Sequence, residues 1–331
     1  MSTKKASKLR QFISGTIALL LIVLAVVIYS NQQYIIDRVT VAQYNPPADV
    51  KQLVKRSAMT DRGKFHFYVG TPSVESTQRF NTQCDRREPQ SAILGCYASG
   101  KIYIYDVPNE QLDGIEEVTA AHEMLHVVFE RLDQEEIDRL TPLLEAEFEK
   151  VSDESFRERM AYYARNQPGQ RINELHSIIG TEKPDISPEL EEYYRQYFTD
   201  RSIVTKLHTQ YETVFNTLSK QVDTLSTRVL ALGEQVESAS LTYNNNVTTL
   251  NGNIEDFNRR ASNGDFASRE EFEAARRDLL VQVDSLEQER ASIDQTIALY
   301  ERLYAELESL ALESSALNKS IDSSLAPAPE L

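Results

Sequence analysis

The sequence predicts an α+β protein that begins with a transmembrane helix and ends in a long antiparallel α-helical coiled-coil hairpin. Three observations support this prediction. An uncharged apolar run lies near the N-terminus, short strand-like and longer helix-like patterns alternate over residues 48–200, and heptad-like repeats fill residues 201–320. Strands repeat their apolar residues every two positions and helices every three or four, so the spacing separates the two classes.

The N-terminal segment has the composition of a membrane anchor. Residues 1–11 form a basic tail, and residues 12–30 contain the run FISGTIALLLIVLAVVIY, with no charge between Arg10 and Asp37. A run of this length matches the hydrocarbon core of a bilayer. A cleaved signal peptide is the alternative, but its apolar core is normally shorter and ends in a small-x-small cleavage site, which this run lacks. We expect an uncleaved anchor with the basic end in the cytoplasm and the remaining chain outside.

The two cysteines agree with an extracytoplasmic location. Cys84 and Cys96 are separated by twelve positions, and a disulfide between them would close this loop in an oxidising compartment. A metal site built on them lacks further Cys or His nearby, and two buried thiols are the remaining alternative. We therefore predict the disulfide.

The charge of the chain restricts its partners. The formal net charge is −16 and the pI is about 4.9. A nucleic-acid-binding protein needs a basic face, so a nucleic-acid partner is excluded. Much of the acidic charge lies in the predicted coil, where it can serve to keep the helices solvated.

Residues 31–47 are expected to be a linker and residues 48–200 a folded domain. Alternating aromatic and apolar residues predict strands at 64–70 and 100–107. Helical spacing recurs in the segments 48–58, 115–132, 134–151, 153–165 and 171–180, and again after Ser187. Gly180 is the expected stop of its helix, and Ser187 and Pro188 are the expected N-cap and first helical residue of the next one.

Residues 201–320 carry the coiled-coil pattern. Apolar residues recur in steps of three and four from Val204 to Val236 and again from Leu279 to Leu307, with an interruption at Arg290. Turn residues near 262–268 separate the two series, and Ser268 with Glu271 forms a capping box. An antiparallel hairpin is the simplest arrangement; a parallel dimer or trimer is the alternative. Residues 321–331 are expected to be a disordered tail.

The stretch TAAHEMLHVV, residues 119–128, contains a motif with a definite chemistry. His122 and His126 are four residues apart, so they share one helix face and can direct two imidazoles at one metal ion. Glu123 is rotated by about 100° and can reach a metal-bound water, whose proton it accepts as the water attacks a carbonyl. This is the HExxH motif of zinc peptidases. Two histidines that are merely hydrogen-bonded on a buried helix are the alternative.

The residues around the motif carry a family resemblance. Ala120, Ala121, Met124, Leu125, Val127 and Val128 are all uncharged, although 26% of the chain is charged. Residues 119–128 resemble the extended signature of the zincin metallopeptidases throughout. The resemblance implies a small zincin-like domain over residues 48–200, with a few-stranded sheet and active-site helices. It also implies one Zn²⁺ per chain and hydrolysis of peptide bonds in a peptide or protein substrate.

A catalytic zinc also needs a third protein ligand. The metzincin branch has Gly and His three and six residues after the second histidine, where this chain has Phe129 and Leu132, so that branch is excluded. The gluzincin branch uses a Glu from a downstream helix, and RINELHSIIG offers Glu174, preceded by Asn173 as in that branch. Ile178 stands where that branch has an aspartate, so the hydrogen-bond partner of a zinc histidine must come from another residue or be missing. A solvent-facing Glu174 is the alternative, with Glu182 as the reserve ligand.

Peptidases of this class also direct a hydrogen-bond donor at the oxyanion. His176 is the catalytic candidate, although a hydrogen bond within the core is an equal alternative, and the rivals are Tyr162, Tyr163, Tyr193, Tyr194 and Tyr197. His66 and His208 are expected to have no catalytic part. The resemblance further implies that an extended substrate pairs with the edge strand before the active-site helix, for which residues 101–107 are the candidate.

We therefore expect a membrane-anchored, extracytoplasmic zinc metallopeptidase of gluzincin type, with His122, His126 and Glu174 as ligands and Glu123 as general base. The coil is expected to position the peptidase, recruit a partner or mediate self-association. A coiled-coil scaffold or adhesion protein with a zinc-binding but inactive head is the alternative. Glu123 argues against it, because a structural zinc site has no need of a base.

Overall fold

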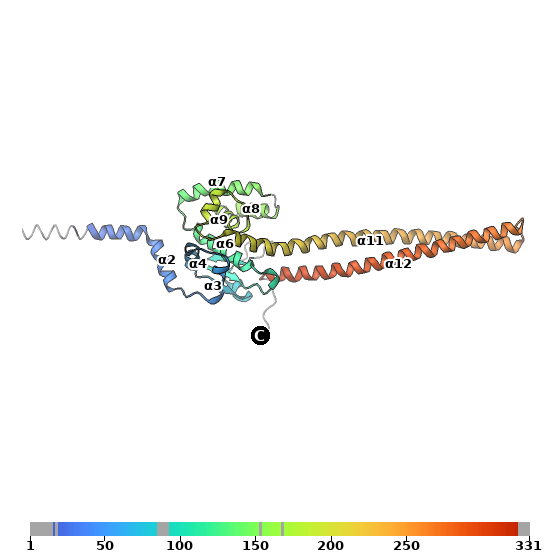
Figure 1. Ribbon diagram of the computed structural model, residues 1–331, viewed down its shortest axis with the longest axis horizontal. Coiled ribbons are helices and arrows are strands. Elements are labelled where there is room, and N and C mark those ends of the chain that lie inside the picture. The colour runs from blue at the N-terminus through green and yellow to red at the C-terminus, as the bar shows by residue number, and fades with distance from the viewer. Residues whose placement is uncertain (1–15, 17–18, 85–92, 152–153, 167–168, 324–331) are drawn as a thin grey trace, which may run out of the picture. The chain divides into compact units, whose positions relative to one another are not determined.

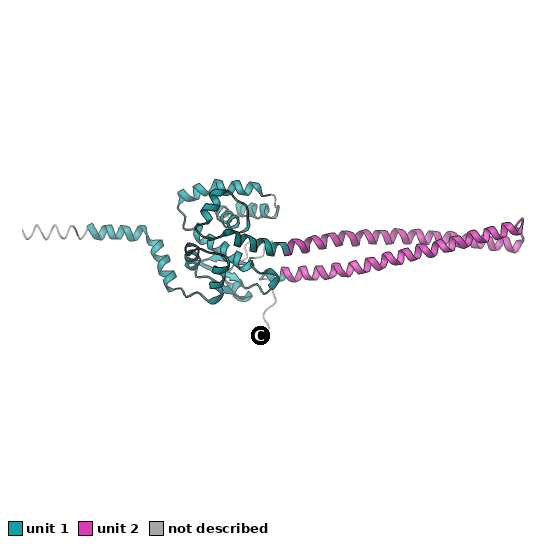
Figure 2. Ribbon diagram, in the orientation of Figure 1, with its two compact units in different colours: residues 1–213, 319–331 teal, residues 214–318 magenta. Residues whose placement is uncertain are grey.

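The computed structural model describes residues 16, 19–84, 93–151, 154–166 and 169–323. The chain divides into two compact units (Figure 2). Unit 1 comprises residues 1–213 and 319–331, and unit 2 comprises residues 214–318. Unit 1 contains a small sheet surrounded by helices, whereas unit 2 consists of two long helical arms (Figure 1). The predicted combination of a small sheet, several helices and a long helical region is thus confirmed.

The helices account for most of the described residues. They are α2 Gln32–Gln43, α3 Ala48–Arg56, α4 Asp61–Val69, α5 Thr77–Gln83, a 3₁₀ turn Glu110–Leu112, α6 Ile115–Phe129, α7 Gln134–Lys150, α8 Glu154–Asn166, α9 Arg171–Glu182, α10 Pro188–Tyr194, α11 Arg201–Asn263 and α12 Arg269–Ile321. The predicted cap of α10 is confirmed, because the Ser187 hydroxyl accepts a hydrogen bond from the Leu190 amide.

The sheet of unit 1 has three strands in the order β1-β3-β2. Strand β1 (Ser73–Glu75) is parallel to β3 (Lys101–Tyr105), and β2 (Gly95–Ala98) is antiparallel to it. The strand predicted at residues 100–107 is therefore confirmed. It is the central strand, however, so the prediction that it is the substrate-binding edge is wrong: its backbone is already paired on both sides.

Two local predictions are also wrong. Residues 64–70 lie in and just after α4 rather than in a strand, because the Thr60 hydroxyl caps that helix by accepting from the Gly63 amide. Helix α9 continues through Gly180 to Glu182. A Cβ at Gly180 would lie 2.5 Å from Leu125 Cδ1, so the glycine serves close packing of α9 on α6 rather than a helix stop.

Helix α6 runs through the core of unit 1. Twelve of its fifteen residues are buried, and it packs most extensively against α9, with α4 and β2 among its other neighbours. The surrounding apolar side chains include Phe67, Ile104 and Ile178, all nearly or fully buried. A helix that is covered on every side must be apolar all round, which explains the uncharged residues that flank the motif.

The predicted disulfide is present. Cys84, directly after α5, is bonded to Cys96 in β2, with a Cα–Cα distance of 5.9 Å. The bond fastens strand β2 to a small apolar cluster that contains Phe80 and Tyr105.

The N-terminal part of the chain differs from the expected linker. Residues 31–47, expected to be a linker, contain helix α2, which packs on α4. Residues 1–15, 17 and 18, which include the basic tail and part of the predicted anchor, lie outside the described residues. Over the described part of the chain, no single helix meets the length and hydropathy of a membrane span. The helices Leu19–Ser30 and Gln32–Gln43, bent by 68°, meet these criteria together.

Unit 2 is an antiparallel helical hairpin. Hydrogen bonds join Asn246 to Glu289 and Asn253 to Gln282. The later residue of α11 thus pairs with the earlier residue of α12, so the two arms run in opposite directions (Figure 1). The expected cap at the start of the second arm is present: Ser268 accepts from the Glu271 amide, and the Glu271 carboxylate accepts from the Ala267 amide. The predicted hairpin is therefore found within a single chain.

The end of the chain returns to unit 1. Residues 324–331 of the expected disordered tail lie outside the described residues. Ser323, also placed in that tail, exchanges hydrogen bonds with the side chain of Asn81 at 2.6 and 2.9 Å.

Candidate metal centre

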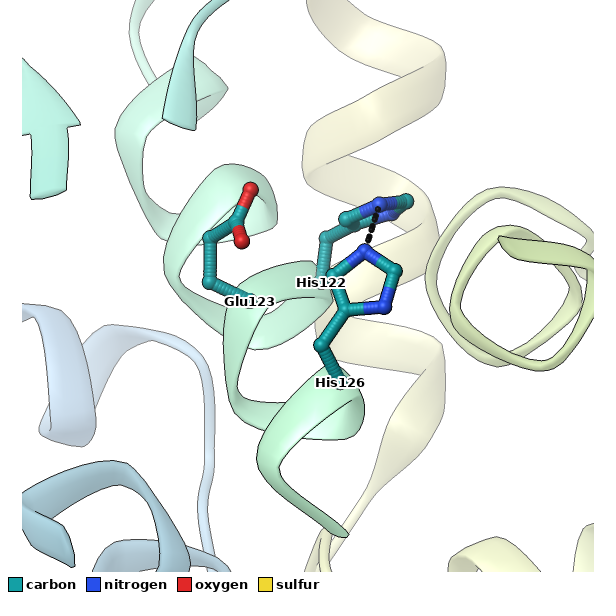
Figure 3. A group of neighbouring side chains, drawn as sticks. All are labelled: His122, Glu123 and His126. Carbon is teal, nitrogen blue, oxygen red and sulfur yellow. Dashed lines mark hydrogen bonds between the residues drawn. The ribbon is translucent and has the colours of Figure 1, made fainter. Parts of the chain in front are cut away.

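The HExxH motif lies within α6, and the helix brings its polar side chains together as the spacing predicts. One ligand atom each from His122, Glu123 and His126 lie within 4.8 Å of one another, and this group could hold a metal ion. In Figure 3 the two imidazoles lie beside each other, with Glu123 projecting from the neighbouring position of the helix. Glu117 and Thr119, about one turn earlier, are the other buried polar residues of this core helix.

The two imidazoles present the same ring nitrogen to one point. His122 Nε2 and His126 Nε2 are 3.0 Å apart (Figure 3). His126 Nδ1 lies 2.9 Å from Asn173 Oδ1 and 3.3 Å from the hydroxyl of Ser177. Because a carbonyl oxygen can only accept, this contact requires a proton on His126 Nδ1, and in the neutral imidazole Nε2 is then the nitrogen that carries the free lone pair. That lone pair is directed at the nitrogen of His122.

Asn173 and Ser177 therefore supply the hydrogen bonds that the sequence left unassigned. Both residues lie on α9 and are buried. They take the place of the aspartate that is missing at Ile178. Asn173 precedes Ile178 by five residues and Ser177 precedes it by one. Hydrogen bonds of this kind orient a metal-binding imidazole and raise its basicity. Asn173 was visible in the sequence beside Glu174, but the direction of its amide depends on how α9 packs against α6.

Glu174 extends from α9 to the same point. Its two carboxylate oxygens lie 3.6 Å from His122 Nε2 and 3.6 Å from His126 Nε2, respectively. Its side chain is only 16% exposed, so the solvent-facing alternative is wrong. The reserve candidate, Glu182, instead forms an ion pair with Arg159 at 3.2 Å.

The Glu123 side chain extends from α6 towards Gly95 in β2. A Cβ at Gly95 would lie 2.7 Å from Glu123 Oε1, so β2 approaches the carboxylate closely only because it has a glycine there. The other oxygen, Oε2, is buried without a hydrogen-bond partner. A buried carboxylate oxygen without a partner is costly, which suggests that a group outside the chain completes the site.

The carboxylates differ in their electrostatic surroundings. Burial raises the pKa of Glu123, and the nearby histidines only partly oppose this. Burial also acts to raise the pKa of Glu174, but His126 and His122 outweigh it and lower that pKa to about 2. Burial would lower the pKa of His122, yet the Glu174 carboxylate prevails and raises it. Glu174 is thus held as an anion beside the imidazoles, whereas Glu123 binds a proton more readily than a free carboxylate.

His176 does not face this group. It is fully buried, its Nε2 lies 2.9 Å from the hydroxyl of Tyr193, and its ring packs against Phe129. This position gives no support to the prediction that His176 is the oxyanion donor, which stays a prediction. The alternative, a histidine hydrogen-bonded within the core, describes its position.

The other candidates are spread over unit 1. Tyr193, Tyr194 and Tyr197 are buried core residues, and Tyr162 and Tyr163 lie half-buried on α8. His66 lies on α4 next to the ring of Tyr197, and His208 lies on α11 with its Nε2 3.7 Å from Glu182.

Comparison of the chain with protein-family models, with curated proteins and with solved structures gives no match.

Proposed function

We propose that the protein is a membrane-anchored zinc peptidase, with its metal centre outside the cytoplasm. The observation that carries the proposal is the convergence of three ligand groups from two helices on one point. His122 Nε2 and His126 Nε2 are 3.0 Å apart, and Glu174 lies 3.6 Å from each. Helix spacing brings His122 and His126 together on α6, but Glu174 lies on α9, so helix periodicity alone does not bring the carboxylate to the two imidazoles.

The spacing of these atoms fits zinc. Zinc binds imidazole nitrogen and carboxylate oxygen at about 2.0–2.2 Å, and tetrahedral geometry then separates neighbouring ligand atoms by roughly 3.3 Å. The observed separations of 3.0 and 3.6 Å lie on either side of that value. Two histidines and one glutamate leave one position open for water, as a catalytic zinc site requires.

Two carboxylates compete for the role of third ligand. Glu123 belongs to the group within 4.8 Å, but it comes from the residue next to His122 and lies against β2. Glu174 is closer to both Nε2 atoms and is held as an anion. We therefore assign Glu174 as the ligand and Glu123 as the general base.

Glu123 has the properties of a base for peptide hydrolysis. Burial raises the pKa of its carboxyl, and a base works best when its pKa approaches the working pH. When bound, zinc would supply an acidified water and polarise the substrate carbonyl. Glu123 would accept the proton of the attacking water at its buried oxygen and donate it to the leaving amine.

Strand β2 is the surface on which an extended peptide would bind. Among the described residues it is paired only with β3, and its first residue, Gly95, lies against Glu123. A peptide added to the other side of β2 would form backbone hydrogen bonds with it, as in β-strand addition. Backbone pairing of this kind is sequence-tolerant, and the neighbouring side chains would set the specificity.

The first test is the zinc content of the full-length chain purified in detergent. We expect about one zinc per chain, a marked loss in Glu174→Ala, and full retention in the control Glu189→Ala, whose exposed glutamate lies on α10. Absence of zinc after loading would contradict the proposal. Zinc that survives Glu174→Ala would contradict the ligand assignment.

Glu123→Gln separates the peptidase from the scaffold alternative. This variant should keep its zinc and lose about 10²- to 10⁴-fold in the cleavage rate of a library of internally quenched peptides. Equal cleavage by the variant would remove Glu123 from the mechanism. A zinc-loaded wild type that cleaves no member of the library, while the protein still performs its cellular role as Glu123→Gln, would favour the scaffold.

A further inference from the structure

Helix α2 has an inner face that belongs to unit 1. Val41 packs against the main hydrophobic core, and Tyr44, just after the helix, donates its hydroxyl hydrogen bond to the Pro72 carbonyl at 2.5 Å. Asp37 is buried on the same face. The spacing 37, 41 and 44 is that of one helix face, so α2 is docked on unit 1 from Asp37 onward, whereas residues 32–36 are exposed.

The strongest contact of the inner face reaches the active-site helix. Asp37 accepts two hydrogen bonds from the Arg131 guanidinium, at 2.7 and 3.0 Å. Arg131 also donates to the carbonyl of Val127 in α6 at 2.9 Å. Arg131 lies five residues after His126, so the ion pair fastens α2 to the end of the helix that carries the metal-binding group.

The outer face of α2 is uncharged, and three of its side chains are exposed aliphatic residues. Ile35, Ile36 and Val39 are 42%, 48% and 50% exposed, respectively. Gln32, Ala42 and Gln43 complete this face, which has no charged residue. Both charged residues of α2 lie elsewhere: Asp37 points inward, and Arg38 lies at the side, where it donates to the hydroxyl of Tyr34 at 2.8 Å.

The chain enters α2 directly from the predicted anchor. The helix Leu19–Ser30 ends two residues before Gln32, and the two helices are bent by 68°. If Leu19–Ser30 is the outer part of a membrane span, α2 must begin at the lipid surface and turn away from the membrane normal. Its continuation into the hydrocarbon core is excluded by the docked neighbour α4, which exposes the charged residues Asp61, Arg62 and Lys64.

We propose that α2 lies flat on the outer surface of the bilayer, with Ile35, Ile36 and Val39 in the lipid headgroup region. The proposal rests on the membrane anchor of the proposed function and is independent of the peptidase chemistry. Apolar side chains opposite a docked polar face, with Tyr and Arg at the boundary, are typical of interfacial helices. A second copy of the chain is a poorer occupant, because three half-exposed aliphatic side chains offer far less than the roughly 800 Å² that each partner contributes to a stable interface.

The arrangement has a consequence for the substrate. Through Asp37 and Arg131, the helix that carries the metal centre is fastened to a helix on the lipid surface. His126 lies about 7–8 Å along the helix from Arg131, at 1.5 Å per residue. The proposed site is therefore held close to the membrane, and its substrates are the membrane-proximal segments of other proteins or peptides bound at the lipid surface.

The test uses full-length protein reconstituted in phosphatidylcholine vesicles that contain a lipid-borne quencher. Single cysteines are introduced as Ile35→Cys and Val39→Cys and labelled with a small fluorophore. The two native cysteines are joined in the disulfide and do not react. Lys51→Cys on α3 is the control for an exposed site away from this face, and Leu24→Cys reports on the anchor.

We expect strong quenching at positions 24, 35 and 39 and weak quenching at position 51. Quenching at 24 with none at 35 and 39 would overturn the inference and leave the anchor intact. No quenching at 24 would overturn the anchor, and the inference with it. Fluorescence at 35 and 39 that is shielded from water and unchanged by the lipid quencher, together with crosslinking between chains, would overturn the inference in favour of a second copy.

Discussion

Asn173 Oδ1 lies 2.9 Å from Nδ1 of His126 and fixes the proton of that imidazole on the nitrogen that faces away from His122. The contact joins α9 to α6. It also determines whether Nε2 of His126 has a lone pair available for a metal ion. An imidazole that rotated, or that carried its proton on Nε2, would be unable to bind a metal at the shared point.

Asn173→Ala should weaken zinc binding by about 10- to 100-fold, the usual cost of removing a hydrogen-bond partner from a metal-binding histidine. Competition with a chelator of known affinity measures the change. Asn173→Asp should restore most of the affinity because it keeps the acceptor. The matched control is Asn166→Ala, since Asn166 is exposed and donates to the Tyr162 carbonyl of its own helix. Equal affinities for the wild type and Asn173→Ala would contradict this assignment.

Gly95→Ala should reduce turnover while zinc is retained. The added Cβ would lie 2.7 Å from Glu123 Oε1 and 2.5 Å from Thr119 Cγ2, so the carboxylate or the strand must move. Misplacement of a base by about 1 Å can cost on the order of 100-fold in rate. The rate of peptide cleavage is measured beside the zinc content. Gly252→Ala, whose added Cβ has no neighbour within 4 Å, should leave both unchanged. Normal turnover in Gly95→Ala would show that the proposed position of Glu123 is not required.

His66 should make the stability of unit 1 dependent on pH. Burial, followed by Arg131 and Arg62, lowers the pKa of its imidazole from 6.5 to about 4. The unfolded chain therefore binds the proton more readily between these two values, and acidification from pH 6.5 to 4 favours unfolding. His66→Phe should flatten this part of the stability profile. Urea unfolding midpoints at pH 7 and pH 4.5, with a chelator present to remove the contribution of metal, provide the comparison. Parallel profiles for the two proteins would rule out this role.

Asp37→Ala should destabilise unit 1 by about 3–5 kcal/mol, because it leaves the Arg131 guanidinium buried without its partner. The side chains of Asp37 and Arg131 are only 6% and 14% exposed. The exposed pair of Asp61 and Lys64 provides the control, since Asp61→Ala removes an ion pair that solvent already screens. Denaturant unfolding measures both variants. Similar midpoints for Asp37→Ala and Asp61→Ala would show that the buried pair does not hold α2 in place.

Much of the site could be predicted because its signals are local. His122, Glu123 and His126 belong to one helical turn, and the uncharged residues around them indicated a buried helix. Glu174 was identifiable because it lies on an otherwise apolar helix. His176 was not, because its two possible environments differ only in which side of α9 faces the core, and that side is set by the packing of Tyr193 and Phe129. The prediction of a strand at residues 64–70 was wrong for a similar reason. The helix cap at Thr60 and the burial of Phe67 outweigh the strand preference of the aromatic residues in this segment.

The sequence by itself determined the helical hairpin, the disulfide partners and the four residues of the candidate metal centre, because periodicity, cysteine number and motif spacing are properties of short segments. Only the tertiary structure decided that β3 is the central strand between β1 and β2, that Asn173 hydrogen-bonds to His126, and that the expected linker contains a helix held by Arg131. Each of these depends on contacts between residues far apart in the chain. Residue spacing within one segment does not predict such contacts, because they form only when separate helices and strands pack around the same core.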